Sequence, residues 1–547
     1  MSGWRAQGGP MSFVGTKYKQ EEVDSHYDAV IIGSGMGSLS TAALLSKAGK
    51  RVLVLEKHYT AGGFTHSYTR KGYEWDVGVH YIGEVHKRLS PLRLLFDLVT
   101  DGKLEWSYMG DTYDSVFFGE ERYDFMAGEE QFMANLLRHF PGEKDTLKNY
   151  IKLIKSANRL AIPFYVSQKI FPDAVGKMAS SLSDSILAKY VRRTTGEVLA
   201  DLTGNKKLRG VLTAQWGNYG LPPAQSSFMI HAAVAHHYLD GGNFPAGGAS
   251  QIARTIEKVI QKPGGKILVN APVSQILVNG SRAMGVRLEN GHEILADRVI
   301  SGAGYFNTFG KLLSTETAEK VGGGSKLKTV RPSIGHVCLY TGMKHDAEEL
   351  KLPMGNLWVY QDYDHDASLA RFLEKPNLDF PLVYISFPSA KDPLWKTNHP
   401  GRSTIDVIAP MPYAWFEKWK GTEWNKRGDE YENYKESISK KLLEKIYKYV
   451  PQAEGKISYY ELSTPLSTEH FGNYSRGELY GIDHNVGRFE QNWMKPQTQI
   501  ENLYVTGQDI LFCGVASALS SGVMTAASIL GSEIGSIVPG FANHFRS

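Results

Sequence analysis

The sequence predicts an α/β protein built around a parallel sheet that is assembled from separated parts of the chain. Three stretches carry this prediction. Residues 27–63 read as strand, glycine-rich turn, helix and strand; residues 271–304 read as a β-meander returning to a buried strand; residues 502–530 read as a strand and an uncharged helix. At 547 residues the chain exceeds the size of one hydrophobic core, so a second domain is expected.

The first stretch is a βαβ unit of the kind that binds a dinucleotide. In such a unit, glycines let the backbone turn tightly and approach a pyrophosphate, whose charge lies against the exposed amides of the helix N-terminus. Gly33 and Gly35 occupy the first two glycine positions, and Ser38 stands where the third glycine is expected, with Gly37 beside it. Because serine is larger than glycine, helix and strand are expected to lie slightly farther apart at Ser38.

Glu56 ends the second strand of this unit, where it is placed to accept hydrogen bonds from an adenosine ribose. The sequence Ala-Gly-Gly that follows, ending at Gly63, extends the pattern toward flavoproteins, because paired glycines let the chain pass close beneath the cofactor. An ordinary flexible loop is the alternative for this stretch. These features together predict FAD as the cofactor.

Gly507 and Asp509 separate the last predicted strand from the uncharged helix. Asp509 is a candidate for binding ribitol or pyrophosphate hydroxyls, and the positive N-terminal end of the helix can face negative charge that develops on a flavin ring. A buried helix with a capping aspartate is the alternative. The predicted cofactor-binding residues are Gly33, Gly35, Met36, Gly37, Ser38, Glu56, Lys57, Gly62, Gly63, Val273, Gly507 and Asp509.

Composition limits the classes of function. A net charge of +4 over the whole chain is too small to suggest a nucleic-acid partner. The two cysteines, Cys338 and Cys513, lie far apart and have no metal-ligand spacing, so neither a disulfide framework nor a metal site is expected. A reducing, cytoplasmic location is the default.

Three segments bear on targeting and membranes. Residues 1–26 are polar, contain no apolar signal segment and are expected to form a flexible arm. Residues 510–532 carry no charge over a length that can span a bilayer, but their Gly, Ser, Thr and Ala content favours a buried helix. Residues 161–191 are a candidate lipid entrance or membrane-surface segment, with ordinary packing as the alternative. Their main apolar residues are Phe164, Tyr165, Ile170 and Phe171.

Further motifs carry a family resemblance. They are GVHYIGE (78–84), FPAGGASQIARTI (244–256), SAKDPLWKTNHPGRSTIDVIAP (389–410), TPLSTEHFGNYSRGELYGIDH (464–484) and VTGQDILFCG near the C-terminus. With the three stretches above, they are similar to the amine oxidase and phytoene desaturase superfamily. More closely, the chain resembles the retinol saturase and carotenoid isomerase branch, over about residues 27–530.

The resemblance implies a Rossmann-type FAD-binding domain made of discontinuous segments. Residues 27–93, 241–309 and 499–547 are assigned to it. The remaining segments, 94–240 and 310–498, are expected to form an α+β substrate domain with a sheet as its floor and helices as its cap. The resemblance also implies that GVHYIGE passes the flavin ring, which makes His80, Tyr81 and Glu84 the candidate catalytic residues. His80 or Tyr81 is favoured as the proton donor, and structural hydrogen bonding is the alternative for each.

The activity that the resemblance implies is that of an FAD-dependent oxidoreductase. Its substrate would be a long apolar polyene or isoprenoid lipid, in which it saturates a carbon–carbon double bond in the manner of a retinol saturase. A redox-neutral isomerase of carotenoids or polyunsaturated fatty acids, or a desaturase, is the alternative. A distant alternative is a non-enzymatic prenyl or lipid carrier similar in fold to Rab GDP-dissociation inhibitors.

The expected partners follow from the cofactor. The chain has one nucleotide-binding βαβ pattern, so electrons are expected from a small external donor or a membrane quinone, unless they return to the same substrate in an isomerisation. A hydrophobic small molecule is the expected substrate, and peripheral contact with a membrane is compatible with it. The sequence makes no prediction of oligomeric state.

Overall fold

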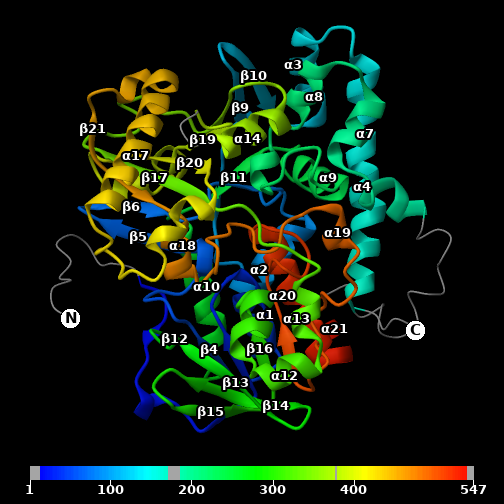
Figure 1. Ribbon diagram of the computed structural model, residues 1–547, viewed down its shortest axis with the longest axis vertical. Coiled ribbons are helices and arrows are strands. Elements are labelled where there is room, and N and C mark those ends of the chain that lie inside the picture. Colours follow the sequence, from blue (N-terminus) through cyan, green and yellow to red (C-terminus); the bar gives the residue numbers. More distant parts are fainter. Residues whose placement is uncertain (1–12, 171–184, 376–378, 539–547) are drawn as a thin grey trace.

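The computed structural model describes residues 13–170, 185–375 and 379–538. Two large sheets form its frame, a six-stranded sheet in the lower half of Figure 1 and a seven-stranded sheet above it. Helices cover both sheets, and the two halves share one extended hydrophobic core. This is the α/β architecture that the sequence predicts.

The six-stranded sheet is parallel throughout. Its strands, in spatial order, are β1 (Thr16–Lys17), β12 (Lys266–Val269), β4 (Val52–Leu55), β3 (Ala29–Ile32), β16 (Val299–Ser301) and β22 (Leu503–Val505). Ala29 and Ile31 pack into the helical side of this sheet, whereas Val30 and Ile32 pack into the core on its other side. Because both faces are covered, nearly every residue of the central strands is apolar.

One face of this sheet is covered by helices that pack against one another. They are α1 (Met36–Lys47), α2 (Pro91–Thr100), α10 (Ser250–Gln261) and α20 (Val515–Leu530). The predicted meander forms a second, four-stranded sheet, with strands β13 (Val273–Asn279), β14 (Arg282–Leu288), β15 (Glu293–Ala296) and β2 (His26–Tyr27). The strand, helix and meander predictions for all three stretches are therefore confirmed.

The expectation of a flexible arm is wrong for residues 13–26. Thr16 and Lys17 pair in parallel with Leu268 and Val269 at the edge of the six-stranded sheet. Val14 is buried, and its backbone N–H donates to the Thr60 hydroxyl. The buried Val14 and the main-chain pairing of β1 therefore hold this polar segment in place. Residues 1–12 lie outside the described residues.

The seven-stranded sheet is the floor of the predicted substrate domain. Its strands, in spatial order, are β10 (Glu121–Met126), β9 (Thr112–Phe118), β18 (Asn356–Tyr360), β19 (Leu382–Ser386), β20 (Ser403–Pro410), β17 (His336–Met343) and β21 (Ile457–Ser463). All seven come from residues 94–240 and 310–498, whereas five strands of the six-stranded sheet come from residues 27–93, 241–309 and 499–547. The domain boundaries themselves stay a prediction.

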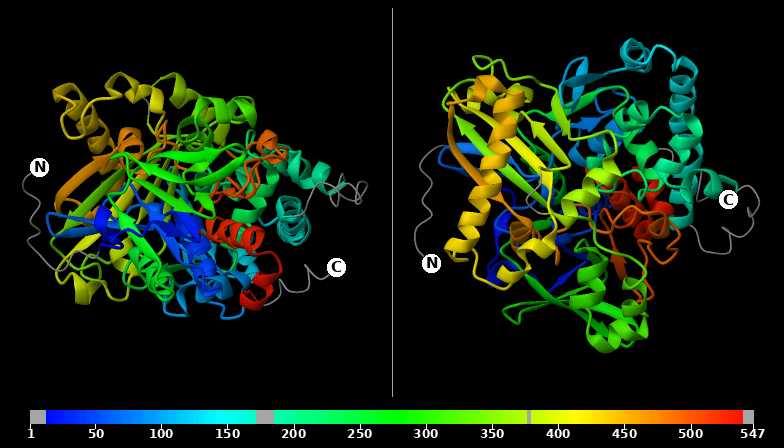
Figure 2. Two further views of the ribbon diagram at one scale, coloured as in Figure 1. Left: turned by 90° about the horizontal axis from the view of Figure 1, so that it is seen from below. Right: turned by 45° about the horizontal axis from the view of Figure 1, so that its top comes forward.

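Helices flank the seven-stranded sheet on two sides (Figure 2). On one side, α4 (Lys144–Ile170) packs along α9 (Phe228–His237), and α17 (Asp429–Tyr449) lies on the opposite side. The other elements of this half are α3 (Glu129–His139), α7 (Thr195–Leu202), α8 (Lys206–Leu212), α14 (His365–Glu374), α18 (Pro465–Gly472) and α19 (Val486–Phe489). Short strands join the halves: β5 (Ser67–Arg70), β6 (Tyr73–Asp76), β7 (Ile82–Gly83), β8 (Trp106–Tyr108) and β11 (Gly242–Pro245).

The first and last parts of the chain meet where α1 packs on α20. A Cβ atom on Gly37 would lie 2.6 Å from the backbone nitrogen of Gly507, and one on Gly522 would lie 2.5 Å from the carbonyl oxygen of Gly37 and collide with the Ser40 hydroxyl. Gly522 is therefore required where α20 meets α1, and Gly37 is required where α1 meets the loop before α20. Elsewhere on α1, Ser38 faces Gly302, which follows β16 and whose missing side chain leaves room for the Ser38 hydroxyl.

The uncharged C-terminal segment contributes to this core. Among the described residues, the helical segment Val515–Ile537 alone is long and apolar enough, by length and composition, to cross a membrane. However, 56% of its apolar window is buried within the protein. The contacts of α20 with α1 give a physical reason for the absence of charged residues from α20.

We predict that Gly522→Ala separates α1 from α20. The added methyl group has a backbone oxygen as its neighbour, which cannot rotate away, so the substitution should lower the free energy of unfolding by about 1–3 kcal/mol. Thermal and urea unfolding of the purified protein would measure this change.

Gly324→Ala is the matched control, since Gly324 is helical and a Cβ there would meet no atom within 4 Å. It should change the free energy of unfolding by less than about 1 kcal/mol. Equal effects of the two substitutions would contradict the packing argument.

Candidate active site

A cavity of about 1680 Å³ lies between the six-stranded and seven-stranded sheets. Ordinary small-molecule pockets occupy roughly 300–1,000 Å³, so this cavity has room for two ligands. Every residue predicted to bind the cofactor or to act in catalysis lines it. The structure thus brings together residues from the first, middle and last parts of the chain.

The turn between β3 and α1 forms an anion-binding end of the cavity. Gly33 has a φ of 83°, which favours glycine, and no side chain caps the N-terminus of α1 at Gly35. The first amides of α1 therefore stay available for a ligand. A Cβ on Gly35 would meet no protein atom within 4 Å, so the space beside this turn is open. A pyrophosphate fits these features.

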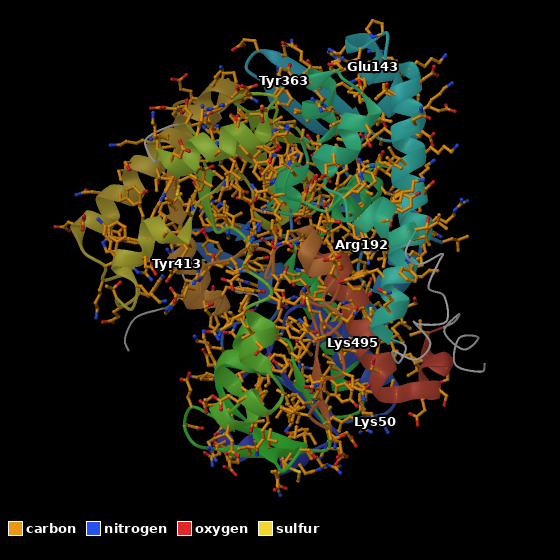
Figure 3. All side chains as sticks on the ribbon, turned by 45° about the vertical axis from the view of Figure 1, so that its right-hand side comes forward. Lys50, Glu143, Arg192, Tyr363, Tyr413 and Lys495 are labelled. Carbon is orange, nitrogen blue, oxygen red and sulfur yellow. The ribbon has the colours of Figure 1, made fainter. Side chains whose placement is uncertain are left out.

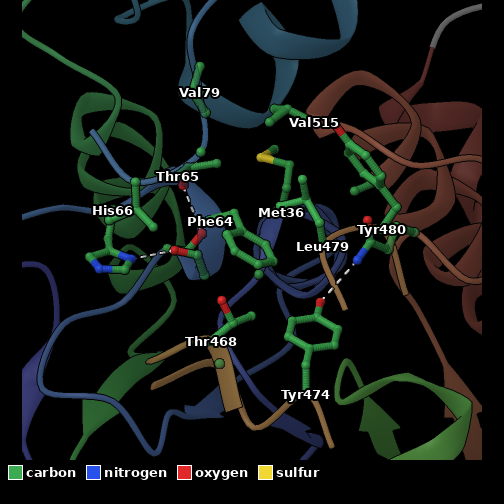
Figure 4. A pocket seen from close by; sticks show the side chains of 18 of the residues that line it. Met36, Phe64, Thr65, His66, Val79, Thr468, Tyr474, Leu479, Tyr480 and Val515 are labelled. Atoms are coloured by element: carbon green, nitrogen blue, oxygen red, sulfur yellow. Dashed lines mark hydrogen bonds between the residues drawn. The ribbon is translucent and has the colours of Figure 1, made fainter. Parts of the chain in front are cut away.

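Glu56 fastens the glycine turn to the loop that contains Gly62 and Gly63. Its carboxylate accepts hydrogen bonds from the Ser34 amide (2.8 Å), the Ser34 hydroxyl (2.6 Å) and the His58 amide (2.8 Å). The same Ser34 hydroxyl accepts a hydrogen bond from the Gly62 amide at 2.9 Å. Gly62 and Gly63 have φ values of 127° and 56°, which explains why glycines are needed here. Figure 4 shows Phe64, Thr65 and His66 next to this loop in the cavity wall.

Asp509 joins three separate segments at the cavity wall. Its carboxylate accepts hydrogen bonds from the backbone amides of Tyr305 and Ile482, both at 3.0 Å. The sequence predicts a direct contact of Asp509 with the cofactor, and the structure adds this joining role. On both sides the carboxylate lies against glycine, at Gly304 and Gly481, where a Cβ atom would collide with it.

Sequence reasoning missed Arg488, which is fully buried behind Asp509. Its guanidinium donates to the backbone oxygens of Ile482, Gln508, Asp509 and Leu511. Because these carbonyl groups point toward Arg488, the loop before α20 is held in a fixed conformation. The signal was weak, since an arginine between a glycine and a phenylalanine reads as a surface residue.

The N-terminus of α20 forms a second positive end at the cavity. No side chain caps this helix at Gly514, and Val515 and Ala516 line the cavity. In Figure 4, Val515 lies on the same side of the pocket as Tyr480. Two helix N-termini therefore converge on one space, and the positive ends of their dipoles stabilise negative charge there. This arrangement suits a dinucleotide whose ring system becomes anionic.

Tyr81 reaches the cavity with a hydrogen-bonded hydroxyl. The hydroxyl donates to the buried carboxylate of Asp114 at 3.0 Å and accepts from the Asn218 side chain at 3.2 Å. Its ring stacks on that of Tyr238, with ring centroids 4.0 Å apart. Burial raises the pKa of Tyr81 well above its ordinary value, so its proton is retained until an acceptor approaches.

His80 reaches the cavity with both ring nitrogens free of hydrogen bonds to the described residues. The ring is 9% exposed, and its Nδ1 atom lies 3.8 Å from a carboxylate oxygen of Asp406. Burial lowers the pKa of His80 to about 3, assisted by the charges of Lys391 and His336. At neutral pH this imidazole is uncharged, so it can donate a hydrogen bond but is a poor acid.

Glu84 faces the opposite way, toward α9. Its carboxylate lies 3.4 Å from the Nδ1 atom of His236. Burial raises the pKa of Glu84, but the interactions with His236 and His237 outweigh it and hold the pKa below its ordinary value. Glu84 is therefore ionised at neutral pH and carries no proton to donate.

Part of the cavity lining is apolar, and this part is called the apolar arm. Its aliphatic residues are Ile162 and Val166 of α4 and Ile230, Ala233 and Val234 of α9. Its aromatic residues are Trp216, Tyr238, Trp358 and Tyr384. Sequence reasoning placed the right segment of α4 here but the wrong residues. Phe164, Tyr165 and Ile170 do not line the cavity, and Phe171 lies outside the described residues.

The comparisons agree with this geometry. Residues 39–305 match the family model described as flavin containing amine oxidoreductase. The chain is 36% identical to all-trans-retinol 13,14-reductase of Homo sapiens over 94% of this chain and 87% of that protein. It is 26% identical to prolycopene isomerase 1, chloroplastic, of an Oncidium hybrid cultivar over 94% of this chain and 86% of that protein.

Among solved structures, a cofactor-binding mutant of putrescine oxidase superposes with a TM-score of 0.61. The two chains are 16% identical, and the match covers 92% of this chain and 99% of that one, so the likeness concerns the fold. The cradle fits FAD, because it offers two uncapped helix N-termini, an open space beside Gly35 and a carboxylate at the end of β4. The chain therefore belongs to the retinol saturase family of flavin-containing amine oxidoreductases, and it is an FAD-dependent oxidoreductase or isomerase.

Proposed function

We propose that this enzyme saturates a carbon–carbon double bond of a long apolar polyene or isoprenoid lipid, such as a retinoid. The observation that carries this proposal is the continuity of the cavity, which joins the FAD cradle to an aromatic and aliphatic arm. A hydrophobic lipid suits that arm because most of its walls come from apolar side chains. The name of the 36% identical human relative supports the retinoid class.

Reduced FAD supplies a hydride when bound, and the protein has to supply orientation, dry surroundings and a proton. The apolar arm would hold the polyene extended between α4 and α9 on one side and the seven-stranded sheet on the other. Tyr81 lines the same cavity and stacks on Tyr238 of the apolar arm, and its hydroxyl is oriented by Asp114 and Asn218. We assign the proton-donating role to Tyr81, with His80 as a neutral hydrogen-bond donor beside it.

Redox-neutral isomerisation of a polyene is the second candidate. The prolycopene isomerase relative supports it, and the same cavity would accept a carotenoid or a polyunsaturated fatty acid. Desaturation is the reverse of saturation and would use the same groups. For net reduction or desaturation, a small external redox partner or a membrane quinone would exchange electrons with the flavin.

We also propose that this is a cytoplasmic enzyme that touches a membrane surface. The exposed face of α4 carries a row of basic residues, Lys148, Lys152, Lys155 and Arg159, followed by the exposed Leu160. Figure 3 shows nitrogen-tipped side chains projecting outward along this helix. The same helix lines the apolar arm, so an anionic bilayer held against α4 would bring lipid near the cavity.

For the cofactor, we propose that the predicted residues from Gly33 to Asp509 hold FAD. Gly35→Ala tests this, because Gly35 has a φ of −62° and a ψ of 167°, which alanine adopts without strain. The protein has room for the new methyl group, so stability without cofactor should be unchanged. The FAD dissociation constant should rise at least about tenfold, which corresponds to about 1.4 kcal/mol. Fluorescence titration of deflavinated protein would measure it, and unchanged affinity would contradict the assignment.

The saturation proposal predicts the product of a single turnover. Anaerobic enzyme, reduced with dithionite and mixed with all-trans-retinol, should reoxidise its flavin and yield a product with two additional hydrogen atoms. Absorbance of the flavin and mass spectrometry of the extracted lipid would be recorded together.

A carotenoid and a polyunsaturated fatty acid are tested in parallel. Unchanged mass with altered chromatographic retention would identify an isomerase instead. A preparation that neither reoxidises its flavin with any of the three lipids nor changes the mass or retention of any of them would overturn the polyene proposal.

The membrane proposal predicts a loss of binding when basic residues of α4 are neutralised. Lys148→Gln, Lys152→Gln and Arg159→Gln together should reduce cosedimentation with phosphatidylserine-containing vesicles at least about tenfold, since each basic residue near such a surface contributes about 1 kcal/mol.

The control removes the same charge from exposed positions on the opposite side of the molecule, with glutamine at Lys418, Lys440 and Lys448. It should leave vesicle binding unchanged. Equal losses for both triple variants would mean that net charge, and not α4, determines the binding.

A further inference from the structure

One face of the seven-stranded sheet carries a buried row of polar side chains behind the cavity. Asp114 of β9 is paired with Asn356 of β18, and Ser386 of β19 is paired with Asp406 of β20. All four side chains are 0% exposed. The neighbouring row on the same face contains Trp358 and Tyr384, which line the cavity. The polar row therefore lies directly beside a row of the sheet that lines the cavity.

Lys391 is the basic residue that is hydrogen-bonded to this polar row. It follows β19, is fully buried, and its ammonium group donates to the Ser386 hydroxyl (2.7 Å), the His80 carbonyl oxygen (3.0 Å) and the side-chain oxygen of Asn356. The bond to His80 fixes the chain segment from which Tyr81 projects. The other two bonds hold Ser386 and Asn356 in place. A buried lysine is costly unless it is paired in this way, so its presence calls for a role.

Asp114 stands between this cation and the cavity. Asn356 donates to one carboxylate oxygen at 3.0 Å, while Gln215 donates to the other at 2.8 Å. That second oxygen also lies 3.0 Å from the Tyr81 hydroxyl. Tyr81 lines the cavity, and Asp114, Asn356 and Lys391 do not. A chain of hydrogen bonds therefore runs from Lys391 through Asn356 and Asp114 to a hydroxyl at the substrate.

We propose that Asp114 is the proton source of the reaction, that it replenishes Tyr81, and that Asn356, Gln215 and Lys391 are positioning residues for its carboxyl group. This inference rests on the proposed saturation of a double bond, which it deepens by naming the acid. Saturation consumes one proton in each turnover, and Tyr81 is the hydroxyl that the hydrogen-bonded chain brings to the cavity.

The step is balanced. When Asp114 is protonated, its carboxyl group donates to the Tyr81 oxygen, and the Tyr81 hydroxyl proton is free to face the cavity. One carbon of the double bond would then accept a hydride from reduced FAD, with both electrons of the new bond, while the adjacent carbon accepts the hydroxyl proton of Tyr81. In the same step the Tyr81 oxygen accepts the carboxyl proton of Asp114, and the side-chain amide of Asn218 donates a hydrogen bond to that oxygen. Asp114 ends as a carboxylate with donors from Asn356 and Gln215, and it regains a proton from solvent after product release.

The electrostatics favour this order. Burial raises the pKa of Asp114 to about 6, against the lowering effect of its hydrogen bonds, so the carboxyl group carries a proton at mildly acidic pH. Burial lowers the pKa of Lys391 to about 7, against the raising effect of the nearby carboxylates. The other titratable groups around Asp114 are Tyr81, Tyr113, Tyr238, Tyr360 and Tyr384. Burial raises the pKa of each tyrosine, so they stay protonated near neutral pH.

Asp114→Asn is the principal test. The hydride-transfer step of the wild-type holoenzyme should slow as pH rises through about 6, because only protonated Asp114 can replenish Tyr81. In the Asp114→Asn variant the rate should fall about 10²–10⁴-fold, the usual contribution of a general acid, and this pH step should disappear. Stopped-flow absorbance with pre-reduced enzyme and all-trans-retinol measures both quantities.

A double-mutant cycle separates catalysis from structure. Tyr81→Phe should slow the step to a similar extent, and the double variant should be no slower than the single variants, since both residues serve one proton transfer. Tyr165→Phe is the matched control. Tyr165 is a buried tyrosine whose hydroxyl has no hydrogen bond among the described residues and does not line the cavity. It should leave the rate and its pH dependence unchanged.

A second readout does not depend on turnover. Infrared spectra of oxidised holoenzyme should show a protonated-carboxyl band that titrates near pH 6 and is absent from Asp114→Asn. If wild-type enzyme reduces no polyene but this band is present, the saturation proposal fails while Asp114 still holds a proton. If Asp114 is ionised at every pH tested, or if Asp114→Asn retains the rate and pH profile of the wild type, the proton-source proposal is wrong.

Discussion

The rest of the structure depends on the close approach of α1 and α20. The amides of both helix N-termini have to remain free of side-chain caps, and both have to reach the same cavity, although the helices belong to opposite ends of the chain. Gly37 and Gly522 permit this approach, because a methyl group at either position would meet backbone atoms. The long chain segments between these two helices in the sequence then form the seven-stranded sheet.

In the seven-stranded sheet, the pairing register of the strands places a row of polar side chains beside a row that contains aromatic side chains. Along one face, the row with Asp114, Asn356 and Asp406 is polar, and the next row, with Trp358 and Tyr384, is aromatic. Neighbouring residues of one row come from different strands, so their chemistry is decided by pairing across the sheet and not by adjacency in the chain. The proposed reaction on a lipid would use both environments, since the aromatic residues line the cavity and the polar row lies beside them.

The parts of the fold that could be predicted are those with local causes. The β3–α1–β4 unit and the meander each follow from short-range periodicity and turn glycines, and the cradle residues followed from the same patterns. The ordered conformation of residues 13–26 was not predicted, because β1 has only two residues and its partner strand, β12, lies far along the chain. Ser38 fits at the third position of the glycine pattern because Gly302, which belongs to another segment of the chain, has no side chain to meet its hydroxyl.

The parts of the site that could not be predicted have non-local causes. Asp114 lies in a strand, TYDSVFF, that shows no clean alternation of apolar and polar residues, so the sequence does not show which way it faces. Its burial and its pairing with Asn356 appear only in the folded sheet. Lys391 lies inside a motif that carried the family resemblance, but its role depends on reaching His80 from another sheet. Arg488 similarly binds the backbone of a distant loop.

The buried carboxyl group also bears on which reaction the cavity serves. Isomerisation of a polyene leaves its proton count unchanged, whereas saturation consumes one proton in each turnover and desaturation releases one. Asp114 lies behind Tyr81, accepts hydrogen bonds from Asn356 and Gln215, and is linked through Asn356 to the buried Lys391. Such an acid is of most use to a reaction that consumes or releases a proton. By microscopic reversibility the same carboxylate would accept the proton in desaturation. The direction is then determined by whether the flavin arrives reduced or oxidised, and the protein supplies the proton or removes it.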